Sequence, residues 1–185
     1  MSGKAVLIVA LKQELPDTGL ADWPVIYTGV GKVNAAISLM AALTKFKPSL
    51  LINYGTAGAV SPGLSGVVEI GKAVQYDMDV RPLGLDLGVT PFEADSDCFT
   101  FADSPLICGT ADRFATRPPD ITCDVVDMEL YALAKIAARE QIPLRAFKFI
   151  SDEADAHANE DWKASLPDAA SAFLDIQDKL LALKD

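Results

Sequence analysis

Short apolar runs bounded by turn-forming residues alternate along this chain with longer stretches in which apolar residues recur at helical spacing. A strand that is apolar on both sides has to be buried on both faces, so the alternation predicts a sheet covered by helices on each side. The predicted fold class is therefore α/β. The predicted strands are Ala5–Ala10, Val25–Tyr27, Leu50–Tyr54, Val67–Val80 in one or two pieces, Leu106–Cys108, Thr122–Val126 and Leu144–Ile150.

Three longer segments have helical periodicity, namely Lys32–Phe46, Glu129–Glu140 and Asp168–Leu183. The buried stripe of the first is predicted to be Ala36, Met40 and Leu43, and Pro48 prevents this helix from continuing. The last helix is predicted to begin with Asp168 as its N-cap. Its apolar face consists of Phe173, Ile176, Leu180 and Leu183.

The chain has 185 residues, half of them hydrophobic, which is the size of one domain with its own core. We therefore expect residues 1–185 to form a single domain. The 26 Asp and Glu against 16 Lys and Arg give a formal net charge of −10, which would repel the phosphate backbone of a nucleic acid. No uninterrupted apolar run reaches the roughly 18 residues of a membrane span. Neither a nucleic acid nor a membrane is an expected partner.

The cysteine and histidine content predicts neither a disulfide framework nor a metal site. Cys98, Cys108 and Cys123 are odd in number and lack CxxC spacing, and His157 is the only histidine. We expect reduced, mostly buried thiols and a histidine at the surface. The apolar run Ala5–Ala10 continues without a cleavage-site pattern, so we expect no secretory signal and a cytoplasmic protein.

Two glycine-containing segments follow predicted strands. The first, Gly29–Lys32, opens a helix as a phosphate-binding loop would, but Ile26 and Val33 stand where such a loop has Gly and Ser or Thr. We interpret it as a tight strand-to-helix turn. In the second, Asn53–Ala59, glycines flank Thr56 directly after a buried strand. This segment fits either a ligand-binding turn or a plain turn.

Three carboxylates also follow predicted strands: Glu14, Glu129 and Asp152. In an open α/β sheet, ligands bind at the carboxyl ends of the strands, so we expect these side chains to face one crevice. Each of them alone is more often a helix cap or a solvated residue. Together in one crevice they would raise one another's pKa, a cost in stability that catalysis often explains.

The least patterned part of the chain is Pro82–Pro105, where acidic and aromatic residues are interleaved. It is either an ordered flap over a site or a mobile surface loop. The chain has no internal repeat and no low-complexity segment.

Four segments carry distinctive motifs: Val30–Ala36, Ile52–Gly58, Val126–Glu129 and Ile150–Asp155. In this order they resemble successive motifs of the purine nucleoside phosphorylase/nucleosidase superfamily, with the greatest similarity to 5′-methylthioadenosine/S-adenosylhomocysteine nucleosidases. The resemblance extends from the N-terminus to about residue 155. It implies a three-layer fold in which a mixed central sheet is flanked by helices.

The resemblance implies an enzyme that hydrolyses the N-ribosidic bond of a purine nucleoside or 5′-thionucleoside and releases the free base. By resemblance, Asp152 would protonate or hydrogen-bond purine N7, Glu129 would hold the ribose hydroxyls and Glu14 would orient the attacking water. Cleavage builds negative charge on the departing base, so a proton at N7 stabilises the leaving group. Asp152 would therefore have to bind a proton, which burial beside other carboxylates favours.

The resemblance also implies substrate-binding residues and partners. Phe114 would stack on the base, Met128 would pack beneath the sugar, and Thr56 would lie near the ribose or the nucleophile. Two further motif residues, Ser151 and Gly58, are expected to line the same site. The implied reaction needs no cofactor and no metal, and the expected partner is a small-molecule purine nucleoside. Members of the family often complete the site with a neighbouring subunit, which predicts a homodimer or higher homo-oligomer.

Two alternatives remain open. Phosphorylases of the superfamily grip phosphate with an arginine in the loop after the first strand, whereas this chain has Leu11–Leu15 there, with a carboxylate at Glu14. This favours water as the nucleophile, although Arg81 could supply a cation for phosphate-dependent cleavage. The chain is also shorter than a usual nucleosidase, which would fit a homologue that binds nucleosides without cleaving them.

Overall fold

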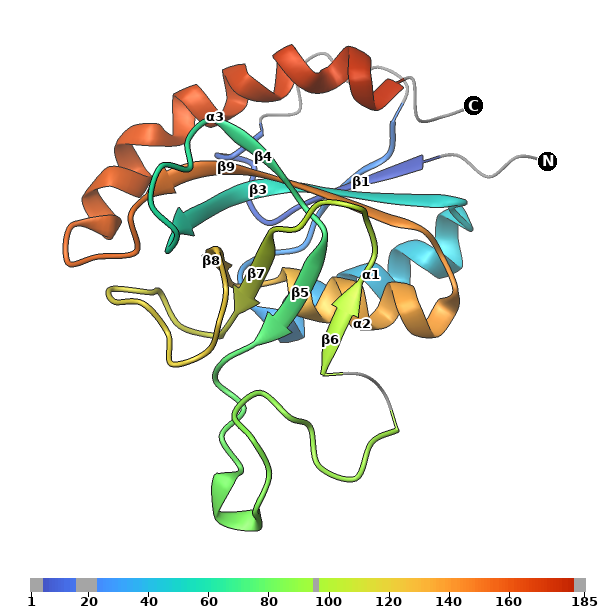
Figure 1. Ribbon diagram of the computed structural model, residues 1–185. Coiled ribbons are helices and arrows are strands. Elements are labelled where there is room, and N and C mark those ends of the chain that lie inside the picture. Colours follow the sequence, from blue (N-terminus) through green and yellow to red (C-terminus); the bar gives the residue numbers. More distant parts are fainter. Residues whose placement is uncertain (1–4, 16–22, 95–96, 182–185) are drawn as a thin grey trace.

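A mixed β-sheet forms the middle layer of the molecule, with helices on both of its faces (Figure 1). The computed structural model describes residues 5–15, 23–94 and 97–181. Within these ranges the nine strands are β1 (Ala5–Val9), β2 (Val25–Tyr27), β3 (Leu50–Ala59), β4 (Val67–Ile70), β5 (Lys72–Gln75), β6 (Cys98–Thr100), β7 (Ile107–Thr110), β8 (Val125–Asp127) and β9 (Leu144–Asp152). The α-helices there are α1 (Lys32–Phe46), α2 (Leu130–Glu140) and α3 (Ala158–Leu181).

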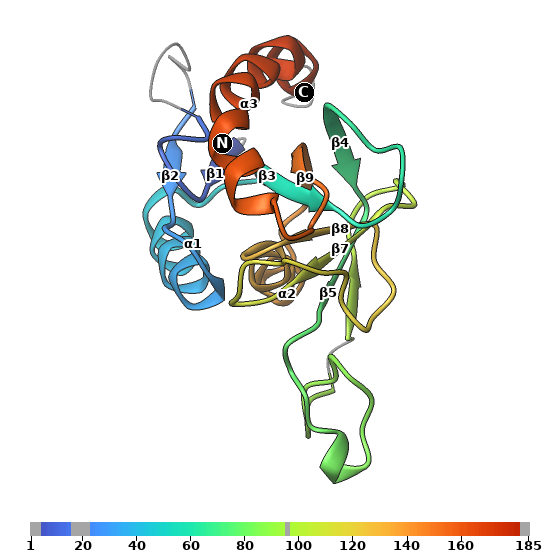
Figure 2. The same cartoon turned by 90° about the vertical axis from the view of Figure 1, so that its left-hand side faces the viewer.

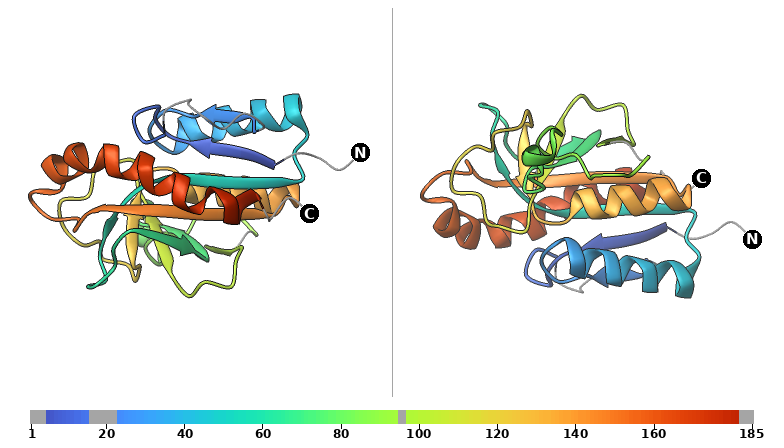
Figure 3. Two further views of the ribbon diagram at one scale, coloured as in Figure 1. Left: turned by 90° about the horizontal axis from the view of Figure 1, so that it is seen from above. Right: turned by 90° about the horizontal axis from the view of Figure 1, so that it is seen from below.

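The helices are divided between the two faces of the sheet. Figure 3 shows α3 over the sheet from above, and α1 with α2 from below. The predicted three-layer α/β arrangement with a mixed sheet is therefore confirmed.

The long strand β3 joins the two halves of the sheet. The strand order is β2-β1-β3-β8-β7-β5-β6, and β9 pairs with β3 and β4 off this path. β3 is parallel to β1 and β9 along most of its length, whereas its last residues, Gly58 and Ala59, pair with β8 in the antiparallel direction. As a result, the ends of β1, β3, β8 and β9 come close together.

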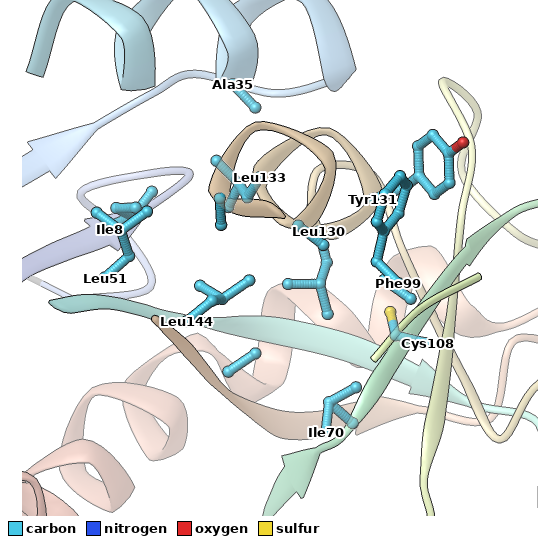
Figure 4. Packing of buried hydrophobic residues seen from close by; sticks show 14 of the residues in the cluster. Ile8, Ala35, Leu51, Ile70, Phe99, Cys108, Leu130, Tyr131, Leu133 and Leu144 are labelled. Carbon is cyan, nitrogen blue, oxygen red and sulfur yellow. The ribbon is translucent and has the colours of Figure 1, made fainter. Parts of the chain in front are cut away.

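Two apolar clusters hold the helices on the sheet. The larger cluster lies between the sheet and helices α1 and α2, and Figure 4 shows Leu51, Leu130 and Leu133 within it. The smaller cluster lies under α3, where Phe173 packs edge-on against Tyr54 with the ring centroids 4.8 Å apart. Burial of both clusters provides most of the favourable free energy of folding.

The strand prediction is wrong in one place that matters for function. β3 does not end at Tyr54 but continues to Ala59, so Asn53–Ala59 is a strand and not a turn. Ala57 pairs with Ile150 and Gly58 with Asp152, so the extra residue at this register shift, Ser151, is a bulge in β9, and β3 continues past it. The small residues here are not turn formers. They leave space over β3 that charged side chains occupy.

The other strand predictions differ mainly at their ends. β2 has its predicted bounds, and the predicted segment Val67–Val80 forms two strands, β4 and β5. β6 lies within Pro82–Pro105 and pairs with β5 in the antiparallel direction. It was not predicted because the acidic and aromatic residues interleaved around it hide any apolar run.

The buried stripe of α1 is wrong by one residue, although the bounds of the helix are those predicted. The buried residues are Ala35, Leu39 and Ala42, while Met40, at the centre of the predicted stripe, is 45% exposed. α1 packs against α2 as well as the sheet, and its alanines allow a close approach. The stripe with the smaller side chains is therefore the buried one.

α3 begins at Ala158 and not at Asp168, which lies inside the helix and caps nothing. The first turns were missed because they are rich in polar residues and because Pro167 interrupts the helical pattern. Phe173 is fully buried, as predicted. The predicted contribution of Leu183 lies outside the described residues.

Much of Pro82–Pro105 projects from the body of the molecule as a long loop (Figure 2). The short 3-10 helix Arg81–Leu83 lies at its start. Its base is held by Gln75, whose Nε2 donates to the carbonyl of Gly88 at 3.1 Å and to Oγ1 of Thr90 at 2.9 Å.

The predicted burial of most cysteines and the predicted surface position of His157 are confirmed. All three cysteines are free thiols, two of them buried and Cys98 partly buried. His157 is an exposed turn residue. Among the described parts of the chain, no helix combines the length and the apolar character needed to cross a membrane.

Phe173→Ala should lower the free energy of unfolding by about 3–5 kcal/mol, because it empties a fully buried position between α3 and β3. Urea unfolding followed by circular dichroism would measure the loss. Leu174→Ala, at a neighbouring position that is 55% exposed, should cost less than about 1 kcal/mol. Equal losses in the two variants would contradict the described packing of α3.

Candidate active site

A pocket opens where β1, β3, β8 and β9 end, between the loop that follows β7 and the first turns of α3. Every site residue predicted from the sequence lines this pocket: Glu14, Thr56, Gly58, Phe114, Met128, Glu129, Ser151 and Asp152. The structure thus brings the expected residues together in one place. Their chemical roles remain predictions.

Glu14 is buried just after β1 and is fixed by three hydrogen bonds. Its Oε1 accepts from the backbone N–H of Thr56 at 2.9 Å and from the hydroxyl of Thr56 at 2.7 Å. Its Oε2 accepts from the N–H of Leu11 at 3.0 Å. Because Thr56 lies on β3, the extension of that strand beyond its predicted end is what orients the carboxylate of Glu14.

Glu129 lies between the end of β8 and the start of α2, and it is 8% exposed. Its Oε1 accepts from the N–H of Gly31 at 2.8 Å, which links it to the turn before α1. Burial, and after it the charge of Asp127, raise the pKa of Glu129 from its ordinary value to about 8. The charge of Lys148 and the hydrogen bond from Gly31 act in the opposite direction.

Asp152 is the last residue of β9, and its side chain is buried in the wall of the same pocket. Its Oδ2 accepts from the hydroxyl of Ser151 at 2.7 Å, and its Oδ1 accepts from the N–H of Ala154 at 3.0 Å. Burial raises the pKa of Asp152, although these two hydrogen bonds oppose the rise. A Cβ atom at Gly58 would lie 2.5 Å from Oδ1, so only glycine leaves room for Asp152 in this position.

Aromatic side chains form the outer wall of the pocket. Phe114, from the loop after β7, is 41% exposed and meets Trp162 of α3 edge-on with the ring centroids 6.3 Å apart. The indole N–H of Trp162 donates to Oγ1 of Thr56 at 2.9 Å. Trp162 therefore contacts both Phe114 in the apolar wall and Thr56, the residue that orients Glu14.

Three residues of this region were not found by sequence reasoning. Trp162 lies in an acidic stretch that was not expected to be helical, so no pattern pointed to it. Lys148 is a lone lysine inside an apolar strand, a signal that was available but not used. Asp127 lies within the motif Val126–Glu129 and received no role.

Among the described residues that line the pocket, the cation predicted for a phosphate-dependent reaction is missing. Arg81 lies in the projecting loop, pairs with Asp79 and does not line the pocket. Arg113 does line it, with the guanidinium 5.0 Å from the ring centroid of Tyr76. Among the described residues, no three His, Cys, Asp or Glu side chains are grouped as metal ligands.

Comparison with known proteins gives one family. The sequence matches the phosphorylase superfamily over residues 24–106 and 98–182. It is 32% identical over 191 residues to the 5′-methylthioadenosine/S-adenosylhomocysteine nucleosidase of Staphylococcus saprophyticus, covering 88% of this chain and 83% of that protein. With the enzyme of the same name from Listeria welshimeri it shares 32% identity over 162 residues, covering 71% and 69% of the two chains.

Solved structures share the fold at lower sequence identity. The futalosine hydrolase of Helicobacter pylori superposes with a TM-score of 0.86 at 17% identity, covering 98% of both chains. The 5′-methylthioadenosine/S-adenosylhomocysteine nucleosidase of Neisseria meningitidis, solved in complex with methylthio-immucillin-A, gives a TM-score of 0.79 at 20% identity over 92% of this chain and 94% of that one.

Glu129→Gln should change how stability depends on pH. Since folding raises the pKa of Glu129 from 4.5 to about 8, the folded protein binds this proton more tightly than the unfolded chain does. The free energy of unfolding should therefore fall as the pH rises through this range, and the variant lacks that loss. As the pH increases from 4.5 to about 8, the Tm of Glu129→Gln relative to that of the wild type should rise by at least about 2 °C. Above about pH 8 the difference in Tm should level off.

Thermal unfolding of both proteins across this pH range would measure the difference. Glu153→Gln, at an exposed position, is the matched control and should track the wild type throughout. A difference between Glu129→Gln and the wild type that does not vary with pH would show that Glu129 ionises normally in the folded protein.

Proposed function

This chain belongs to the phosphorylase superfamily, and from that premise we propose that it is a nucleosidase that hydrolyses the N-ribosidic bond of a purine nucleoside and releases the free base. The proposed substrates are 5′-thionucleosides of the methylthioadenosine and adenosylhomocysteine type, as in the names of its relatives. The observation that carries the proposal is the convergence of Glu14, Glu129 and Asp152 on one pocket.

Asp152 is proposed to be the general acid. When the bond between the ribose and the base breaks, the base leaves with the bonding electrons, and a proton delivered to N7 makes it a better leaving group. The raised pKa of Asp152 supports this role, because the side chain can then hold a proton closer to neutral pH. The bond from Ser151 to Oδ2 and the bond from Ala154 to Oδ1 fix the orientation of the carboxyl group.

The two glutamates are proposed to act on the sugar side. Glu129 would accept hydrogen bonds from the ribose hydroxyls, which fixes the sugar while positive charge develops on it. Glu14 would accept a proton from the attacking water, and its three hydrogen bonds hold it in one orientation for that task. Met128 would pack beneath the sugar, and Phe114 would stack on the base.

Hydrolysis is favoured over phosphorolysis by the charge at the nucleophile's position. A phosphate ion beside Glu14 would meet a carboxylate where it needs a cation, whereas a water molecule would meet a proton acceptor. Arg113 is the pocket-lining cation that a phosphate-dependent reaction would have to recruit. The same carboxylates argue against a homologue that only binds nucleosides, because burying them costs stability that binding alone does not require.

A homo-oligomer remains part of the proposal. α1 exposes the apolar residues Val33, Ile37 and Met40, which are 67%, 65% and 45% accessible in the single chain. Val30, which is 41% exposed, continues this face to the edge of the pocket. An isologous contact across such a face would cover it in a dimer.

The decisive test is chromatographic detection of free base from a panel containing methylthioadenosine, adenosylhomocysteine, adenosine and inosine, with and without phosphate. We expect base release from the 5′-thionucleosides, at a rate that phosphate does not change, with a free sugar as the second product. Release that occurs only with phosphate and yields a sugar 1-phosphate would establish phosphorolysis. Ligand-induced thermal stabilisation without any base release would establish a binding protein.

Asp152→Asn should lower kcat by at least about 100-fold, because the amide cannot transfer a proton to the base. KM should change much less, since the amide can still hydrogen-bond to the base. The matched control is Asp168→Asn in an exposed turn of α3, which should leave the rate unchanged. A nearly normal kcat in Asp152→Asn would remove Asp152 from the mechanism.

A further inference from the structure

A fully buried ion pair lies beside the proposed sugar-binding residue. Nζ of Lys148 is 2.8 Å from Oδ2 of Asp127, and both side chains are 1% exposed. Lys148 stands opposite Gly55 in the pairing of β9 with β3, and a Cβ atom at Gly55 would lie 3.7 Å from its ammonium group. The lysine therefore lies directly over β3, within ordinary contact distance of this position.

Asp127 also holds the start of α2. Its Oδ2 accepts from the N–H of Leu130 at 2.9 Å, and its Oδ1 accepts from the hydroxyl of Thr110 at 2.6 Å. The same hydroxyl oxygen accepts from the N–H of Tyr131 at 2.9 Å. These side chains satisfy backbone donors in the first turn of α2, as N-terminal caps do. Because Glu129 lies between Asp127 and Leu130 in the chain, its backbone is fixed from both sides.

The charges around Glu129 come from several elements and oppose one another. Asp127 on β8 and Glu14 after β1 disfavour a negative charge on Glu129, whereas Lys148 on β9 favours it. On the side of α1, Gly31 donates its N–H to Glu129. The charged groups beyond that turn are engaged with one another, namely Lys32, Asp77 and Asp112.

We propose that Lys148 and Asp127 are positioning residues for Glu129, holding it at the pocket and setting the pH range in which it is a carboxylate. The proposal rests on the proposed function, in which Glu129 accepts hydrogen bonds from ribose. Only the ionised form of Glu129 offers both oxygens as acceptors while it keeps its bond to Gly31. Burial alone would lower the pKa of Lys148, but the charge of Asp127 and also that of Glu129 raise it, so the lysine stays charged beside the pocket and ionised Glu129 remains as its counter-charge when Asp127 is removed.

The proposal predicts opposite effects of removing the two charges. Asp127→Asn removes a negative charge next to Glu129 and leaves the lysine, so Glu129 should ionise at a pH lower by about one unit or more. Lys148→Met removes the positive charge, so Glu129 should ionise at a higher pH than in the wild type. A merely structural role would make both variants less stable without moving the ionisation in opposite directions.

The first readout needs no substrate. Each protein is compared with its own Glu129→Gln derivative, and the pH at which the difference in Tm levels off marks the ionisation of Glu129 in the folded state. We expect this pH to fall in Asp127→Asn and to rise in Lys148→Met. The proposal would be overturned if this pH stayed unchanged in both Asp127→Asn and Lys148→Met, or if it shifted in the same direction in both variants.

The second readout is the pH profile of base release from methylthioadenosine. The rising limb of kcat/KM reports groups that must be deprotonated, so it should move in the same opposite directions as the first readout. A limb that stays in place in both variants would overturn the proposal. If the wild type releases no base, the proposed function fails, while the Tm comparison still decides the role of the pair.

Matched variants keep the test independent of folding failures. Lys148→Arg retains the charge and should leave the ionisation of Glu129 in place. The double variant Lys148→Met with Asp127→Asn removes both charges. In it, the pH at which Glu129 ionises should return close to the wild-type value. If Asp127→Asn does not fold, an unmoved ionisation in Lys148→Met is enough to overturn the proposal. Lys135→Met removes a positive charge elsewhere on α2, from a lysine that is paired with Glu93, and it should change neither readout.

Discussion

The absence of a side chain at Gly58 of β3 is the constraint on which the position of Asp152, the proposed general acid, depends. Hydrogen-bonded strands lie only about 4.8 Å apart, so charged side chains can lie across β3 only where β3 has none of its own. Gly58 provides this space for Asp152, since a Cβ atom there would lie 2.5 Å from Oδ1, whereas a Cβ atom at Gly55 would make ordinary contacts with Glu14 and Lys148. The chemistry of the pocket is thus set by what the central strand omits, and the strand stays continuous because its pairing with β9 continues through the bulge.

Negative charge is concentrated in a place where burial makes it costly, and the fold offsets that cost locally. Glu14, Glu129 and Asp152 each accept at least one hydrogen bond from a backbone N–H group, and Lys148 supplies a buried positive charge nearby. The two apolar clusters lie on either side of the sheet and reach the edge of the site, where Ala57 lines the pocket and Leu130 donates its N–H to Asp127. The core and the site therefore share the central sheet, and only the site violates the rules that the core obeys, as is common in enzymes.

The sequence predicts the layers well because strand and helix periods depend on burial, and burial was regular in β2, α1 and most of the sheet. It also points to the residues around the pocket, since motifs at strand ends are brought together by any open α/β sheet. The failures have physical causes. Gly55 and Gly58 have turn-forming chemistry but lie inside a strand, and Met40 is larger than the alanines that pack α1 closely. Trp162 depends on contacts between distant segments, which no local pattern records, whereas Lys148 has a local signal, a single lysine within an apolar strand.

The place of β9 has a consequence for the newly made chain. β9 lies between β3 and β4 although it follows all the other described strands in the sequence, so one edge of β3 stays open until β9 has been synthesised. Open strand edges pair readily with other chains, and pairing between distant segments is slow. Insertion of this strand, followed by docking of α3 behind it, is therefore the late step at which productive folding and aggregation compete. A chaperone that shields β3 during synthesis would raise the yield of native protein without touching the pocket.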